Sequence, residues 1–145
     1  MTSSPQTRWT LVVVAGLGTM VFLLLADVIF VTYYAQLKAP GQDQAFYNQF
    51  ALDTAGPFIF CFSPFPVYII SRWLCEKAGN QYYLHAGLYI ASYYLLDVLM
   101  IAGMGAWEGL LSLEYLLNVL AFAAGALAGA YFAGKAGREI ASPLQ

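Results

Sequence analysis

The chain has 145 residues, of which 61% are hydrophobic and only 10% are charged, and its formal net charge is −2. A soluble domain carries about a quarter charged residues, so this composition excludes a globular protein that faces water on all sides. No basic patch is dense enough to suggest a nucleic-acid partner, and no motif indicates a cofactor. The lipid bilayer is the expected environment.

Four stretches are apolar enough to cross that bilayer. A helix needs roughly 20 apolar residues to span the hydrocarbon core, and residues 10–33, 54–72, 82–104 and 111–132 meet this requirement. The connectors between them are too short to hold a separate soluble domain. We therefore expect residues 1–145 to form one all-α domain, an antiparallel bundle of four transmembrane helices.

The basic residues predict the orientation of this bundle. One of the six is Lys38, and the other five fall in the N-terminal tail, the second connector and the C-terminal tail, at Arg8, Arg72, Lys77, Lys135 and Arg138. Four crossings put these three segments on one side of the membrane. The positive-inside rule then places both termini in the cytoplasm. We expect a multi-pass protein of a bacterial inner membrane or a plasma membrane.

The first window contains an acid. Asp27 precedes Tyr33 by six residues, about 9 Å of helix, and Tyr33 marks the outer interface. Asp27 is therefore expected inside the outer half of the membrane. The connector at residues 36–53 carries Phe46 and Phe50 at an i, i+4 spacing, which indicates a short interfacial helix.

The second window contains two prolines in its interior, Pro64 and Pro66. Each removes a main-chain N–H and clashes with the carbonyl four residues earlier, so the window is expected to be kinked. An irregular backbone in hydrocarbon needs protein or a wet cavity beside it, so the kink should face the bundle interior. Cys61 and Cys75 are expected to be buried small apolar side chains.

The third window carries His85, Tyr89, Tyr93 and Asp97 at four-residue intervals, which places them on one helix face. One interpretation is a proton path from His85 to Asp97. The simpler interpretation, which we prefer, is an interfacial histidine and two tyrosines whose hydroxyls bond to neighbouring helices.

The two intramembrane acids are the main candidates for a functional site. No basic residue lies at the depth of either acid, and an isolated carboxylate in hydrocarbon must protonate or acquire partners. We expect a polar site in the middle-to-outer part of the bundle, with binding or proton-coupling candidates Asp27, Asp97, Tyr89, Tyr93 and Asn118. The alternatives are protonated acids that only bond to adjacent helices, or acids that each meet a basic residue of a partner protein.

The fourth window contains a row of small residues at four-residue intervals. Such rows let two helices approach closely, and this one comprises Ala121, Gly125, Gly129 and Ala133 and continues to Gly137. It is expected to pack against the first or third span of the same chain, or against a second protein molecule.

These patterns favour a small, non-enzymatic membrane protein that acts by helix docking, as an accessory subunit or in a homo-oligomer. The alternative is a small proton- or cation-coupled transporter of a lipophilic or cationic solute that uses Asp27, Asp97 and aromatic walls. No nucleophile–base pair, metal-ligand cluster or phosphate-binding loop is present, so we expect neither an enzyme nor a metal site.

Overall fold

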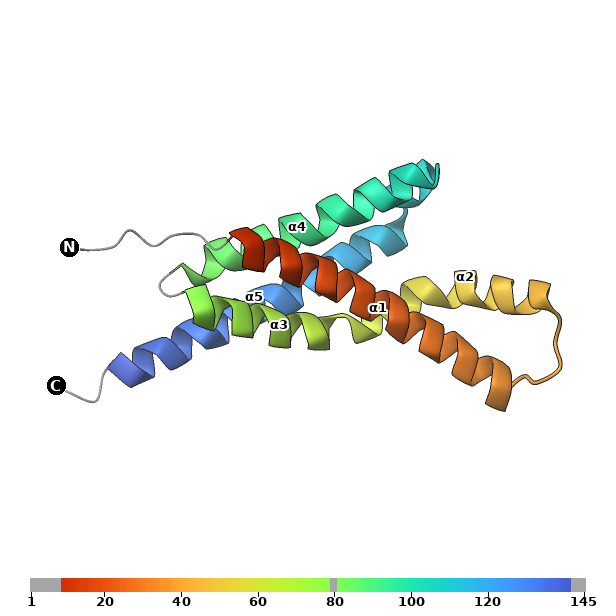
Figure 1. Ribbon diagram of the computed structural model, residues 1–145, viewed down its shortest axis with the longest axis horizontal. Coiled ribbons are helices and arrows are strands. Elements are labelled where there is room, and N and C mark those ends of the chain that lie inside the picture. Colours follow the sequence, from red (N-terminus) through yellow and green to blue (C-terminus); the bar gives the residue numbers. More distant parts are fainter. Residues whose placement is uncertain (1–8, 79–80, 142–145) are drawn as a thin grey trace.

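The computed structural model describes residues 9–78 and 81–141. In this part of the chain five α-helices and one short 3-10 helix follow one another: α1 (Trp9–Leu37), α2 (Gln44–Phe62), α3 (Pro64–Ala78), α4 (Tyr82–Gly103), η1 (Trp107–Leu111) and α5 (Leu113–Ala141). The protein is therefore all-α. The start of α1, the end of α3, the start of α4 and the end of α5 lie at the same end of the molecule, here called the inner end (Figure 1).

Three of these helices are long and apolar enough to cross a membrane: α1, α4 and, within α5, the segment Leu113–Gly137. A fourth candidate is the pair formed by α2 and α3, in which Gln44–Phe62 and Pro64–Lys77 meet at an angle of 45°. The described residues thus contain three candidate spans, or four if the bent pair is one span.

The break between α2 and α3 lies at Ser63, directly before Pro64. Because Pro64 and Pro66 have no N–H, the carbonyls of Phe60 and Phe62 lose their helical partners. The side chain of Ser63 is fully buried. The irregular backbone therefore lies against protein, as hydrocarbon requires.

The connector after α1 is shorter than the sequence indicates. The Asp43 side chain accepts a hydrogen bond from the main-chain N–H of Phe46 at 2.8 Å and caps α2, which begins at the next residue. The Tyr47 hydroxyl donates to a main-chain carbonyl of the turn at 2.6 Å. The expected interfacial helix around Phe46 and Phe50 is consequently not a separate element but the first turns of α2.

The row of small residues on α5 packs against α3 of the same chain. A Cβ atom on Gly125 would lie 2.7 Å from the carbonyl oxygen of Pro64, and one on Gly129 would lie 2.7 Å from that of Tyr68. The expected partners were the first or third span or a second molecule, so the prediction was wrong for Gly125 and Gly129. At the inner end of the row, a Cβ on Gly137 would lie 2.6 Å from the hydroxyl oxygen of Tyr82, which belongs to the expected third span. Small residues permit another helix to approach closely, but they do not specify which helix; that depends on how the helices are arranged in space.

A small buried cluster lies further along the same seam. The cluster consists of Cys75, Ala86, Ala130 and Ala133. Ala121, at the other end of the row of small residues, lies outside the cluster and is only half-buried. The prediction of a buried cysteine is confirmed for Cys75 and wrong for Cys61, which is exposed on α2. No residue of α2 is buried, and the Cys61 side chain lies on a part of this helix that no other helix covers.

Fully buried residues are confined to the inner part of the molecule. Every buried residue of the described chain lies within residues 12–23, 63–93 or 122–134. We call this part the inner bundle. Residues 24–62 (the first arm) and residues 94–121 (the second arm) contain no buried residue. The two arms extend away from the inner end and diverge from each other (Figure 1).

The first arm is held together by stacked aromatic rings. Neighbouring ring centroids are 3.8–6.1 Å apart along the order Phe22, Phe62, Phe58, Phe30, Phe50 and Tyr34. Stacked rings at such distances each add about 0.5–1.5 kcal/mol beyond area burial. The arms touch where Glu114 of α5 lies against Gly56 of α2, since a Cβ on Gly56 would be 3.1 Å from Glu114 Oε2.

Candidate polar site in the outer half

Three of the predicted site residues share one position relative to the packing. Each lies one helical turn beyond the outermost buried residue of its helix, on the side toward the arms. The pairs are Leu23 and Asp27 on α1, Tyr93 and Asp97 on α4, and Phe122 and Asn118 on α5. The acids and the amide therefore lie at the boundary between the inner bundle and the arms.

Asp97 faces α5 and lies in a group of aromatic hydroxyls. The Tyr115 hydroxyl is near enough to interact with the Asp97 carboxylate, although it does not meet hydrogen-bond geometry. The Tyr94 hydroxyl donates to the main-chain carbonyl of Asn118 at 3.2 Å. Tyr94 and Tyr115 were missed in the sequence. Tyr115 could have been found, because it precedes Asn118 by three residues and shares its helix face.

Asp27 lies on a different helix surface. It follows Gly16 by eleven residues, which is close to three helical turns, so both occupy the same side of α1. A Cβ on Gly16 would lie 2.6 Å from Oγ of Ser92, so this is the side that meets α4 in the inner bundle. Farther out α1 and α4 diverge (Figure 1). Asp27 Oδ1 is buried and has no hydrogen-bond partner among the described residues.

No hydrogen bond or electrostatic interaction among the described residues joins Asp27 to Asp97. The two acids lie at the same boundary, but on helices that diverge there. A site that uses both acids stays a prediction.

The stripe on α4 faces the protein interior. His85, Tyr89 and Tyr93 are buried, and the Tyr89 hydroxyl lies 2.6 Å from Oγ1 of Thr19. Thr19 Oγ1 itself donates to the Ala15 carbonyl at 2.8 Å, so Tyr89 is the donor to Thr19. This bond fastens α4 to α1.

The other members of the stripe do not continue that bond. The Tyr93 ring packs against Phe122 with centroids 4.2 Å apart, and Nδ1 of His85 lies 2.8 Å from the Gln81 carbonyl oxygen. No hydrogen bond among the described residues links His85, Tyr89 and Tyr93 to one another. The contacts support the packing interpretation of the stripe over a proton path.

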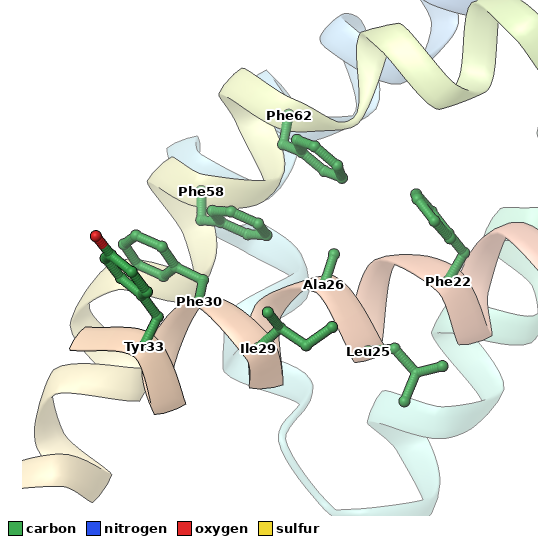
Figure 2. Close-up of a pocket in the computed structure, with 8 residues that line it drawn as sticks. All are labelled: Phe22, Leu25, Ala26, Ile29, Phe30, Tyr33, Phe58 and Phe62. Atoms are coloured by element: carbon green, nitrogen blue, oxygen red, sulfur yellow. The ribbon is translucent and has the colours of Figure 1, made fainter. Parts of the chain in front are cut away.

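An apolar groove lies on the other side of α1, between α1 and α2. It has a volume of about 520 Å³ and is lined by Phe22, Leu25, Ala26, Ile29, Phe30, Tyr33, Phe58 and Phe62 (Figure 2). Five of these eight residues are aromatic. Asp27 is not among them, because one residue step from Ala26 turns it about 100° around the helix. The aromatic walls and the carboxylate expected for a lipophilic cation are therefore on different sides of α1.

Neither a metal centre nor a relative identifies the site. Among the described residues no group of three or more His, Cys, Asp or Glu side chains could hold a metal ion. Comparison with protein-family models, with curated proteins and with solved structures finds no match for the chain.

Proposed function

We propose that this protein is a non-enzymatic integral membrane protein that docks another membrane protein, either a second copy or a larger partner, through its two arms. The observation that carries this proposal is the absence of any buried residue in residues 24–62 and 94–121. Helices in a membrane associate through close packing and interhelical hydrogen bonds. The contacts within the arms, which are the stacked rings of the first and the Tyr94–Asn118 hydrogen bond of the second, leave no residue buried, so the arms retain surface that a partner could cover.

Asp27 adds a polar reason for a partner. Its buried Oδ1 has no donor among the described residues, and a buried acceptor left unpaired costs about 1–3 kcal/mol. A partner helix that supplies a hydroxyl, amide or basic side chain beside the diverging part of α1 would remove this cost. Acids within transmembrane helices usually pair with another polar group, and no basic residue of this chain lies at the depth of Asp27.

Two further observations support the non-enzymatic assignment and the orientation. The His85 ring and the Cys75 thiol are directed at the main-chain carbonyls of Gln81 and Tyr82, at 2.8 and 3.2 Å, rather than at each other. The basic residues Arg72 and Lys77 lie in the last two turns of α3, at the inner end. The positive-inside rule then favours a cytoplasmic inner end.

Cysteine cross-linking in native membranes tests the docking proposal. In a background without the native cysteines, single cysteines at Val28 and Leu52 of the first arm and at Leu99 of the second arm are labelled with a benzophenone maleimide and irradiated, so that the label inserts into a C–H bond of the protein beside it. These side chains are 60%, 75% and 60% exposed. At least one arm position is expected to give a cross-linked product, of twice the chain mass for a second copy or of another discrete mass for a partner.

The matched control is a cysteine at Ile69 of α3, which is 63% exposed but belongs to the inner bundle. It is expected to give no discrete product. Equal cross-linking at Ile69 and at the arms would indicate random collision and would contradict docking, as would the absence of a product at every arm position.

The second candidate function is proton- or cation-coupled transport. It is favoured by the position of Asp27 and Asp97, which both lie one turn beyond the buried residues of their helices, and by the divergence of α1 and α4 away from the inner end (Figure 1). In that case a solute would enter between the diverging arms from the outer side. The cysteines on the arms would then be expected to give no cross-linked product.

A further inference from the structure

We propose that α1 joins two copies of this chain as a parallel two-stranded coiled coil, in which Asp27 of each copy forms a hydrogen bond with the partner subunit's Thr32. This coiled coil rests on the proposed docking and makes its partner a second copy. One face of α1 carries apolar residues at alternating intervals of three and four residues. We call it the heptad face, and it comprises Val14, Leu17, Val21, Leu24, Val28 and Val31.

The heptad face is left open by the other helices of the chain. Its first five side chains are 46–60% exposed. Intervals of three and four average 3.5 residues, which is the period at which two helices supercoil and keep one face of each in contact. A second helix of the same period can therefore lie along the whole face.

The kinds of residue on the heptad face favour two parallel strands. Because α1 is largely apolar all round, the spacing alone does not distinguish this face from others. The first position of each heptad, called a, is a valine at Val14, Val21 and Val28, and the position between, called d, is a leucine at Leu17 and Leu24. β-branched residues at a with leucine at d favour parallel dimers. Packing at the crossing angle of a coiled coil is also common between membrane helices.

Two copies in one membrane present α1 in the same direction. Among the described residues, the basic side chains toward the inner end belong to Arg72, Lys77, Lys135 and Arg138, whereas Lys38 alone lies at the other end. This bias favours one orientation for every copy. The α1 helices of neighbouring copies are then parallel, as the valine and leucine positions require.

Asp27 and Thr32 flank the heptad face at positions that meet across such a dimer. Asp27 directly precedes Val28 and occupies the position called g, whereas Thr32 follows Val28 by four residues and occupies the position called e. In a parallel pair a g residue lies opposite the e residue of the next heptad on the other helix, and these side chains influence the choice of partner. A second copy therefore places its Thr32 beside Asp27.

Both groups lack a partner within one chain. Among the described residues Asp27 has no hydrogen bond at its buried Oδ1 or at the accessible Oδ2. Thr32 is exposed, and its hydroxyl makes no hydrogen bond in the same part of the chain. A hydroxyl both donates and accepts, so it can bond to Oδ2 in either protonation state of the acid. The two-fold symmetry of a dimer forms this bond twice.

Disulfide formation in the membrane tests the geometry of the dimer. In the full chain without its native cysteines, single cysteines replace Val21 or Val28, and the matched controls replace Phe22 or Ile29. The exposed fractions are 48% and 60% at the first two positions and 47% and 68% at the controls, which lie about 100° further around the helix. Oxidation with copper phenanthroline should give about fivefold more linked dimer at Val21 and Val28, because facing a positions are within disulfide reach.

The dissociation constant of the dimer tests the polar pair. It is measured by energy transfer between labelled full-length chains in phosphatidylcholine vesicles. Thr32→Val and Asp27→Leu should each weaken dimerisation about tenfold through loss of the two symmetry-related bonds. The double variant should be no weaker than either single variant, since both substitutions remove the same bonds. Asp27→Asn keeps a side chain that can bond to a hydroxyl and should stay within about twofold of the unaltered protein.

Equal disulfide yields at Val28 and Ile29 would overturn the proposal, because random collision does not select a helix face. Independent, multiplicative effects of Thr32→Val and Asp27→Leu would overturn the pairing as well. A photo-cross-linked arm product whose mass is not twice that of the chain, without a disulfide at Val21 or Val28, would leave docking intact and contradict the α1 dimer. The absence of any arm product or disulfide would contradict both.

Discussion

Replacing Gly129 by alanine is expected to destabilise the protein by about 3 kcal/mol, the upper part of the range for overpacking. The new Cβ would lie 2.7 Å from the carbonyl oxygen of Tyr68 and 2.8 Å from the main-chain nitrogen of Arg72. Both atoms belong to the backbone of α3, so no side-chain rotation relieves the clash. The α3–α5 seam must open, and the free energy of unfolding in a denaturing-detergent titration should fall.

Gly87→Ala is the matched control for this substitution. Gly87 is exposed on α4, and a Cβ there would have no atom of a neighbouring element within 4 Å. Alanine favours a helix by up to about 1 kcal/mol over glycine, so Gly87→Ala should be neutral or slightly stabilising. A Gly129→Ala protein that keeps its unfolding free energy but separates from an oligomer would contradict the assignment of the row to an internal contact.

Truncation of Phe122 to alanine should destabilise the fold by about 3–5 kcal/mol. Phe122 is 1% exposed, and its ring centroid lies 5.5, 4.2 and 5.4 Å from those of Tyr89, Tyr93 and Tyr94. It fills the space where α4 and α5 converge, and alanine leaves a cavity that these rings cannot all close. The same unfolding titration measures the loss.

Phe65→Ala separates burial from the mere removal of a phenyl ring. Phe65 is 70% exposed on α3, so its truncation in a bilayer should change the unfolding free energy by less than about 1 kcal/mol. If both variants lose equal stability, the burial of Phe122 between α4 and α5 does not account for its contribution, and the fold would be contradicted at this point.

Periodicity and apolar run length predicted the helix class and the candidate spans, because the hydrocarbon thickness constrains both. The missing N–H groups of Pro64 and Pro66 predicted the break in the helix, because they affect only the turn that precedes each proline. Local chemistry also explains the error in the first connector: Asp43 is an N-cap, and the cap extends α2 beyond the apolar window. An apolar window finds the part of a helix that is in hydrocarbon, not the full helix.

The long-range errors have another cause. The row that contains Gly125 and Gly129 indicates close approach and leaves the partner helix open, since the first and third spans were equally compatible with it. The same limit applies to Asp27 and Asp97. Their depth follows from helical rise, but the divergence of the helices that carry them depends on crossing geometry, which the spacing of residues in one chain does not encode. The arms were not predicted for this reason.

The mass of the intact protein, measured by native mass spectrometry after extraction in a mild detergent, tests most directly whether the arms are covered by another protein. The docking account predicts a discrete mass above that of one chain, either two chains or one chain with a stoichiometric partner. It also predicts that lysine at Val28 and Leu99, the exposed arm positions, reduces this mass to that of a single folded chain. A single chain in the unaltered protein, folded and stable without a partner, would contradict it.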